Sequence, residues 1–173
     1  VESLGKTKKK EELADFGRPR RILLCVTGLS PQIVTETLYA LVHAEQPFVP
    51  TEIHLVTTLE GARLARAALL HPDGGQFYAL LADYPALGRP RFDEDTIHVI
   101  ADAEGAPLAD IRSPQDNAAA ADAITARLAV LTRDDNAALH VSIAGGRKTM
   151  GFYLGYAYSL YARPQDRLSH VLV

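Results

Sequence analysis

The segment with the clearest chemistry in this sequence joins two glycines to two cationic residues. It consists of Gly145, Gly146, Arg147 and Lys148. They follow a short apolar run at residues 138–141, typical of a buried strand, and lead into a helix-forming stretch. Glycines let a ligand approach the backbone closely, and a helix start offers free N–H groups and the positive end of a dipole. Thr149, in the first turn, adds a hydroxyl that can cap the helix or bind phosphate. Together these groups predict a site for the phosphates of a nucleotide or another polyanion.

The spacing of this segment does not fit the two commonest nucleotide-binding motifs. A P-loop places a glycine directly before its lysine, whereas Arg147 separates Gly146 from Lys148. The dinucleotide-binding pattern Gly-x-Gly-x-x-Gly is absent after the first apolar run. We therefore predict neither an ATPase nor an NAD enzyme. The simpler alternative is a tightly packed helix start whose basic side chains face solvent.

A second polar loop follows the first apolar run and consists of Thr27, Gly28, Leu29, Ser30, Pro31 and Gln32. Ser30 directly before Pro31 predicts a helix that Ser30 caps and that has Pro31 in its first position. A nucleophile elbow would require glycine two positions after the serine, where this sequence has Gln32. We therefore favour a helix-capping role for Ser30 over a nucleophilic one. Because ligands bind beyond the carboxyl ends of parallel strands, we expect this loop to share one site with residues 145–149.

Thr57 and Thr58 end the next apolar run and are candidates for the same crevice. Their alternative role is that of ordinary hydroxyls at a strand end.

Apolar runs alternate with stretches of helical spacing along the chain, which predicts an α/β protein with a Rossmann-like, open, mostly parallel sheet and helices on both faces. The expected strands are residues 21–27, 52–58, 96–100, 138–144 and 168–173, and the expected helices are residues 31–44, 60–70, 77–82, 113–131 and 147–162. Ser113 and Pro114 repeat the pattern of a capping residue followed by proline.

Length and composition restrict the class of protein. A chain of 173 residues fits one domain with a sizeable core. Its net charge of −3 argues against binding to duplex nucleic acid, which needs an extended basic surface. The single cysteine, Cys25, lies in an apolar run, as expected of a buried thiol in a reducing compartment. The apolar runs are far shorter than the roughly 18 residues of a membrane span, so we predict a cytoplasmic protein.

The N-terminal residues differ in charge from the rest. Residues 1–21 hold seven Lys and Arg but four acidic residues, so the remainder of the chain is acidic. We predict a basic, flexible tail or linker at residues 1–20 and a ligand-binding domain at residues 21–173. Val1 in place of Met and the apolar end of the sequence suggest part of a longer protein, and the alternative to a free cytoplasmic protein is one tethered to a membrane by a segment not present here.

The six histidines do not have the spacing of metal ligands, and ordinary packing explains those in or beside expected strands. We therefore predict no metal site and no other cofactor.

Two long motifs, at residues 27–41 and 142–157, resemble the two signature loops of CARF domains, the CRISPR-associated Rossmann-fold sensors of type III CRISPR systems. The segment from Asp110 to Asn117 also resembles one CARF subfamily, and the likeness extends over nearly all of residues 21–173. The resemblance implies a homodimer that binds a cyclic oligoadenylate, usually the tetra-adenylate, across its two-fold axis. It implies that Gly145, Gly146 and Lys148 hold phosphates and that Ser30 and Gln32 contact the ribose-phosphate backbone.

The resemblance leaves the activity open. The first hypothesis is a sensor that switches an attached effector module outside this chain in antiviral defence. The second is a slow, metal-independent ring nuclease, in which Ser30 and Lys148 would be catalytic. A transcription regulator is a weaker third possibility, because no DNA-reading helix is apparent in the sequence.

Overall fold

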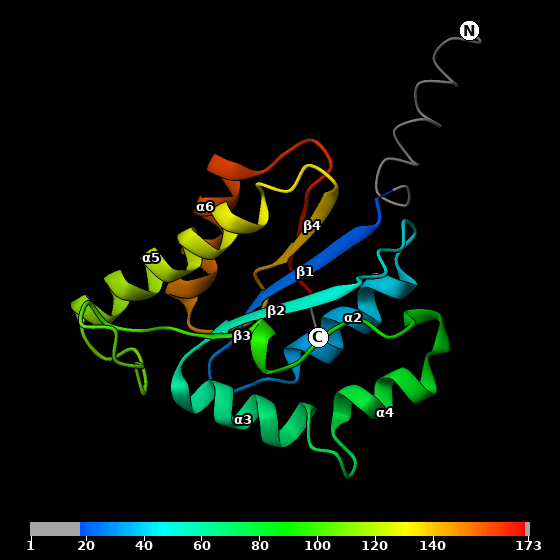
Figure 1. Cartoon of the computed structure of the whole chain (residues 1–173), viewed down its shortest axis with the longest axis horizontal. Coiled ribbons are helices and arrows are strands. Elements are labelled where there is room, and N and C mark those ends of the chain that lie inside the picture. The colour runs from blue at the N-terminus through cyan, green and yellow to red at the C-terminus, as the bar shows by residue number, and fades with distance from the viewer. Residues whose placement is uncertain (1–17, 172–173) are drawn as a thin grey trace, which may run out of the picture.

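A computed structural model describes residues 18–171 (Figure 1). Five parallel strands form one sheet in the order β3-β2-β1-β4-β5. The strands are β1 (Arg20–Val26), β2 (Glu52–Thr57), β3 (Ile97–Val99), β4 (Ala137–Ser142) and β5 (Arg167–Ser169). The helices are α2 (Ile33–His43), α3 (Leu59–Leu69), α4 (Gln76–Asp83), α5 (Pro114–Leu131) and α6 (Lys148–Tyr161), with short 3₁₀ turns at Pro85–Leu87 and Glu94–Thr96. The predicted Rossmann-like α/β fold is confirmed.

Helices cover both faces of the sheet, as Figure 1 shows: α2, α3 and α4 lie on one face, and α5 and α6 on the other. Alternate residues of β1 supply the two cores, because successive side chains of a strand point to opposite faces. Ile22 and Leu24 pack toward α5 and α6, whereas Leu23 and Cys25 pack toward α2 and α3. Burial on both faces explains why the strands appear in the sequence as continuous apolar runs.

The structure also tests smaller predictions. Cys25 is buried, as expected, and burial raises the pKa of its thiol to about 12. Ser113 caps α5 and Pro114 is its first residue, as predicted. The last expected strand is shorter in the structure, ending at Ser169, and residues 172–173 lie outside the described part of the chain. Residues 1–17 of the expected tail lie outside it too, so the domain boundaries stay a prediction. No helix within residues 18–171 is long and apolar enough to cross a membrane.

The edge strand β5 is held to β4 by a buried carboxylate. Asp166 has a fully buried side chain that accepts hydrogen bonds from the backbone N–H of Leu139 and of Arg163, each at 2.9 Å. The guanidinium of Arg163 donates to both oxygens of the same carboxylate, each bond again 2.9 Å long. This network fixes the turn between α6 and β5 and aligns β5 with its neighbour.

We predict that Asp166→Ala lowers the free energy of unfolding by about 3 kcal/mol, because it leaves the partly buried guanidinium of Arg163 and the backbone N–H groups of Leu139 and Arg163 without their carboxylate acceptor. Urea denaturation measures the change. Asp135→Ala, at an exposed position, is the matched control and should change stability by less than about 0.5 kcal/mol. Equal stability of the two variants would contradict this role for Asp166.

Candidate functional site

The candidate site lies where the direction of the sheet's connections reverses. The chain goes from β1 through β2 to β3 on one side, and β4 and β5 are added on the other side of β1. The carboxyl ends of β1 and β4 are therefore neighbours, and their loops diverge to opposite faces, which leaves a crevice. A Cβ atom built on Gly28 would lie 3.9 Å from Cα of Gly146, so the two loops are in contact. The structure thus brings together the two segments that sequence analysis assigned to one site.

Both glycines of the second loop are needed for its conformation. A Cβ atom on Gly145 would lie 2.4 Å from the carbonyl oxygen of Val26 and 2.8 Å from Cγ2 of Ile33, closer than real contacts allow. Gly146 has φ +78°, in the left-handed region that side chains disfavour. The turn therefore lies directly against the end of β1 because neither residue carries a side chain.

The amino end of α6 opens at this turn. The helix begins at Lys148, and Arg147 at the N-cap position makes no side-chain capping bond. Within residues 18–171, no acceptor bonds the backbone N–H groups of Lys148 and Thr149. Lys148 and Thr149 are exposed, and the Lys148 ammonium has no ion-pair or hydrogen-bond partner among the described residues. Free N–H groups, a helix dipole and an unpaired cation make this end of α6 a suitable place for an anion.

Arg147 differs from Lys148 because a carboxylate already holds it. Nη2 of Arg147 donates to both oxygens of Asp110, at 2.9 and 2.7 Å. This hydrogen bond from Arg147 is the main cause that lowers the pKa of Asp110. The remaining donors of the guanidinium, Nε and Nη1, have no acceptor among the described residues and can still meet a phosphate. Asp110 therefore fixes the direction of Arg147 and offsets part of its charge.

The first loop exposes side chains that the sequence suggested for the site, but the helix after it begins later than expected. The predicted capping role of Ser30 is wrong: α2 starts at Ile33, Gln32 occupies the N-cap position, and no side chain caps the helix. Pro31 forms a turn ahead of the helix, and its carbonyl accepts from the N–H of Val34 at 3.1 Å. Because the hydroxyl of Ser30 is not used in a cap, it stays exposed, as do the side chains of Leu29 and Gln32.

The predicted threonines lie inside the protein. The hydroxyl of Thr57 donates to the carbonyl of Thr27 at 2.7 Å, and both residues are fully buried. Thr58 caps α3 by accepting from the N–H of Gly61 at 3.2 Å. These hydroxyls form hydrogen bonds inside the protein, beneath the two loops. The exposed residues of the candidate site are Leu29, Ser30, Gln32, Gly146, Arg147, Lys148 and Thr149.

The backbone N–H groups that follow β2 are also unavailable to a ligand. The backbone N–H of Leu59, at the start of α3, donates to the carbonyl of Leu108 at 2.8 Å, and that of Glu60 donates to the carbonyl of Ala109 at 3.4 Å. The segment before Asp110 thus takes the donors that α3 would otherwise offer to an anion.

An open cleft of about 580 Å³ continues from the glycine turn along α6. Beyond residues 143–148, its lining comes from Gly151, Phe152, Gly155, Tyr156 and His170. The aromatic residues and Asp110 are parts of the candidate site that the sequence did not predict. The four-residue spacing of Phe152 and Tyr156 in the sequence places both rings on one face of α6 and could have indicated that they line the cleft together. No group of three or more His, Cys, Asp or Glu within residues 18–171 could hold a metal ion.

The described residues form an α/β protein with a glycine turn and an open helix start at the switch point of a parallel sheet. Residues 30–173 match the family described as CRISPR-associated protein NE0113, and the chain belongs to this family. The chain also resembles a solved structure of Enterococcus italicus Csm6 bound to cyclic hexa-2′-fluoro-hexa-dAMP, with a TM-score of 0.51 and 15% identity. The match covers 89% of this chain and 34% of that one, so this chain spans about a third of the length of Csm6. No curated protein matches the sequence.

These comparisons confirm the predicted CARF-type CRISPR family and its fold. The roles of individual site residues stay predictions.

The pairing of Arg147 with Asp110 has a testable consequence. We predict that Arg147→Ala raises the pKa of Asp110 toward its usual value, because the main group that favours the carboxylate is lost. A carboxyl group whose pKa is lowered by folding stabilises the protein fully at pH values above the pKa of the unfolded state. This contribution is lost as the pH falls through the pKa of the folded state. The variant should therefore lose stability near neutral pH and less at acid pH. A pH titration of the Asp110 carboxyl carbon by NMR measures the shift.

Arg112→Ala is the control for this titration, because Arg112 contacts Asp110 only at 3.5 Å. Its effect on the pKa of Asp110 should be smaller. An equal effect of the two variants would contradict the assigned pairing.

Proposed function

We propose that this chain is a CARF sensor domain that binds a cyclic oligoadenylate, with cyclic tetra-adenylate as the preferred ligand. Binding by a homodimer would switch an attached effector in type III CRISPR defence. The observation that carries the proposal is the cradle at the switch point, where the Gly145–Gly146 turn, the open end of α6 and the unpaired Lys148 adjoin the exposed loop of Ser30. The family and the ligand named for Csm6 support the same class of ligand.

The chemistry of the cradle suits several phosphates on one ring. Each charge-assisted hydrogen bond to a phosphate contributes about 1.5–3 kcal/mol. One chain supplies the N–H groups of α6, Lys148 and the free donors of Arg147. Two copies related by a two-fold axis would supply the same set twice, which matches the symmetry of a cyclic tetranucleotide. The acidic remainder of the chain would restrict anion binding to this local site.

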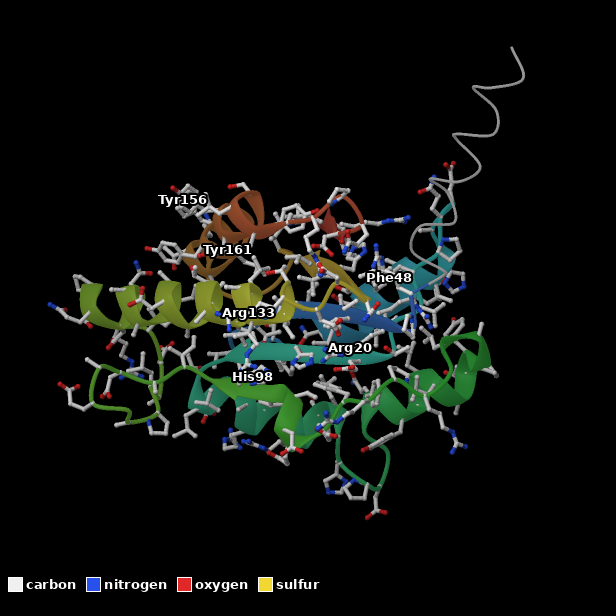
Figure 2. The ribbon with its side chains drawn as sticks, turned by 45° about the horizontal axis from the view of Figure 1, so that its top comes forward. Arg20, Phe48, His98, Arg133, Tyr156 and Tyr161 are labelled. Carbon is white, nitrogen blue, oxygen red and sulfur yellow. The ribbon has the colours of Figure 1, made fainter. Side chains whose placement is uncertain are left out.

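The exposed face of α6 supports a homodimer. Phe152, Tyr156 and Leu160 follow one another at four-residue spacing, and each is about 60–66% exposed. Figure 2 shows Tyr156 at the outer surface of the molecule, away from the sheet. Large exposed apolar groups on one helix face are typical of protein interfaces. This face shares Phe152 and Tyr156 with the cleft beside the cradle, so a partner on α6 would lie next to the ligand.

A ring nuclease is the second candidate function, and the free hydroxyl of Ser30 favours it. In this reaction a ribose 2′-oxygen attacks the neighbouring phosphorus and the bond from phosphorus to the 5′-oxygen breaks. The 2′-hydroxyl proton leaves and the 5′-oxygen gains one, which gives a linear product that ends in a 2′,3′-cyclic phosphate. Lys148 would stabilise the charge that develops on the phosphoryl oxygens, and Ser30 would position the phosphate. No His or carboxylate within residues 18–171 hydrogen-bonds to either residue, so turnover would be slow.

We predict that Lys148→Ala weakens binding of cyclic tetra-adenylate by roughly 10–100-fold, which corresponds to the loss of one charge-assisted contact to phosphate. Arg89→Ala removes an exposed cation far from the site and should bind like the parent protein. Incubation for hours followed by chromatography of the nucleotide separates the two functions. Intact ligand contradicts the nuclease, whereas linear products that Lys148→Ala abolishes contradict a pure sensor. Failure of cyclic tetra- and hexa-adenylate to bind contradicts both.

The dimer face gives a separate prediction. Tyr156→Glu should convert the dimer to a monomer and weaken ligand binding, because it places a charge in an apolar interface. Tyr78→Glu is the matched control, since Tyr78 is 45% exposed on α4, on the other face of the sheet. Sedimentation velocity measures the oligomeric state of both. A Tyr156→Glu dimer of unchanged stability would exclude this face.

A further inference from the structure

A small cleft lies at the β3 edge of the sheet, between β3 and α5, and shares no lining residue with the candidate site. Figure 2 shows His98 of β3 in this region, below α5. The cleft has a volume of about 270 Å³ and is lined by Val56, His98, Val99, Ala123, Ala126, Arg127 and Val130. Its walls are apolar except for the side chains of His98 and Arg127. It is smaller than pockets for drug-sized ligands, which start at about 300 Å³.

Arg127 is a half-buried cation without a counter-ion. No carboxylate or other acceptor within residues 18–171 pairs with its guanidinium. Burial lowers the pKa of Arg127, and no acidic neighbour opposes this effect. The guanidinium lines the same cleft as His98, and after burial its charge is a further cause that lowers the pKa values of His54 and His98. Arginines taken partly out of water are normally paired with an anion, and the described part of the chain supplies no carboxylate to Arg127.

The two histidines form a chain of hydrogen bonds whose direction can be assigned. Arg20 donates to Glu52 and lowers the pKa of Glu52 to about 2, so this carboxylate is ionised at neutral pH. Nε2 of His54 lies 3.2 Å from Glu52 and must therefore be the protonated nitrogen of the neutral ring. Nδ1 of His54 is then an acceptor, and Nε2 of His98, 2.9 Å away, donates to it. Nδ1 of His98 is left with a lone pair and no partner among the described residues.

Solvent can reach the unpaired side-chain nitrogens of Arg127 and His98. Among the described residues, the buried polar side-chain atoms without a partner are Nε of Arg18 and Nδ1 of His140. The unpaired nitrogens of Arg127 and His98 are therefore reached by solvent, and a ligand in the cleft can reach them too.

We propose that this cleft binds a carboxylate that carries a short apolar stem. The guanidinium of Arg127 would donate to the carboxylate oxygens, a geometry for which arginine is well suited. The stem would lie against Val56, Ala126 and Val130, and the size of the cleft admits only a few heavy atoms beyond the carboxylate. Apolar walls favour a weakly hydrated carboxylate over phosphate, which loses more hydration on entry.

Binding would be linked to a proton on His98. Its Nδ1 can donate to the carboxylate only after it takes up a proton, and the bound anion would offset the repulsion from Arg127. The other charged or titratable groups near His98 are His54, Glu52 and Arg20 of the neighbouring strands. The pKa of His98 is about 4 without ligand, because burial and Arg127 both disfavour its charged form. A carboxylate should raise this pKa, and each unit of the rise strengthens binding at acid pH by at most a factor of about 10.

The test is a titration of the His98 ring by NMR in the whole chain, with sodium butyrate as the probe. We expect saturating butyrate to raise the pKa of His98 above its value of about 4 in the free protein. Butyramide, which has the same shape without the charge, should leave the pKa unchanged. Arg127→Gln should raise the pKa of His98 by itself and abolish the effect of butyrate. Arg133→Gln removes an exposed charge just beyond the same helix and should behave like the parent protein.

The proposal is overturned if butyrate leaves the pKa of His98 unchanged in the parent protein, or if Arg127→Gln responds to butyrate as the parent does. It is also overturned if inorganic phosphate shifts the pKa more than butyrate does, since the site would then select charge alone. If Arg127→Gln fails to fold, the comparison of butyrate with butyramide in the parent protein remains decisive. None of these outcomes depends on cyclic oligoadenylate.

Discussion

The candidate site depends on the parallel pairing of β1 with β4 and on the backbone contact at their carboxyl ends. β1 is the central strand, and its register with β4 runs from Arg20 opposite Ala137 to Cys25 opposite Ser142. Directly beyond these pairs, Gly145 lies against the carbonyl of Val26, where even a methyl group has no room. This contact sets where α6 begins, and so it sets the position of the free N–H groups and of Lys148 relative to the Ser30 loop. A side chain at Gly145 would separate the two halves of the site without removing any group that contacts a ligand.

The two cations of the turn differ in their surroundings, although they are adjacent in sequence. Asp110 holds Arg147 by one nitrogen, whereas Lys148 has no partner within residues 18–171. An arginine that is already paired costs less conformational entropy when a phosphate arrives, but part of its charge is offset. A lysine without a partner keeps its full charge for the ligand. The same segment that supplies Asp110 also closes the amino end of α3 through the carbonyls of Leu108 and Ala109. Of these two helix starts, only that of α6 keeps free N–H groups among the described residues.

Much of the fold could be predicted from the sequence, because strands buried on both faces are continuous apolar runs and their crossover helices keep helical spacing. The pairing of the two loops could also be predicted, since parallel strands place their carboxyl ends at one edge. The details that the sequence could not predict depend on tertiary contacts. Ser30 precedes a proline, but the chain makes an extra turn and α2 begins at Ile33. Thr57 ends a strand, but its hydroxyl bonds to the carbonyl of Thr27 inside the protein. Asp110 joins the site from 37 residues away, and its ion pair with Arg147 has no local signal in the sequence.

If the two loops form half of a shared site for one cyclic oligoadenylate, two chains bind each ring, so the stoichiometry of binding distinguishes a shared site from a separate one. Isothermal titration calorimetry of cyclic tetra-adenylate into the purified chain measures both affinity and the number of rings bound. We expect one ring for every two chains. One ring per chain, or no heat of binding with cyclic tetra- or hexa-adenylate, would exclude a shared site for this ligand.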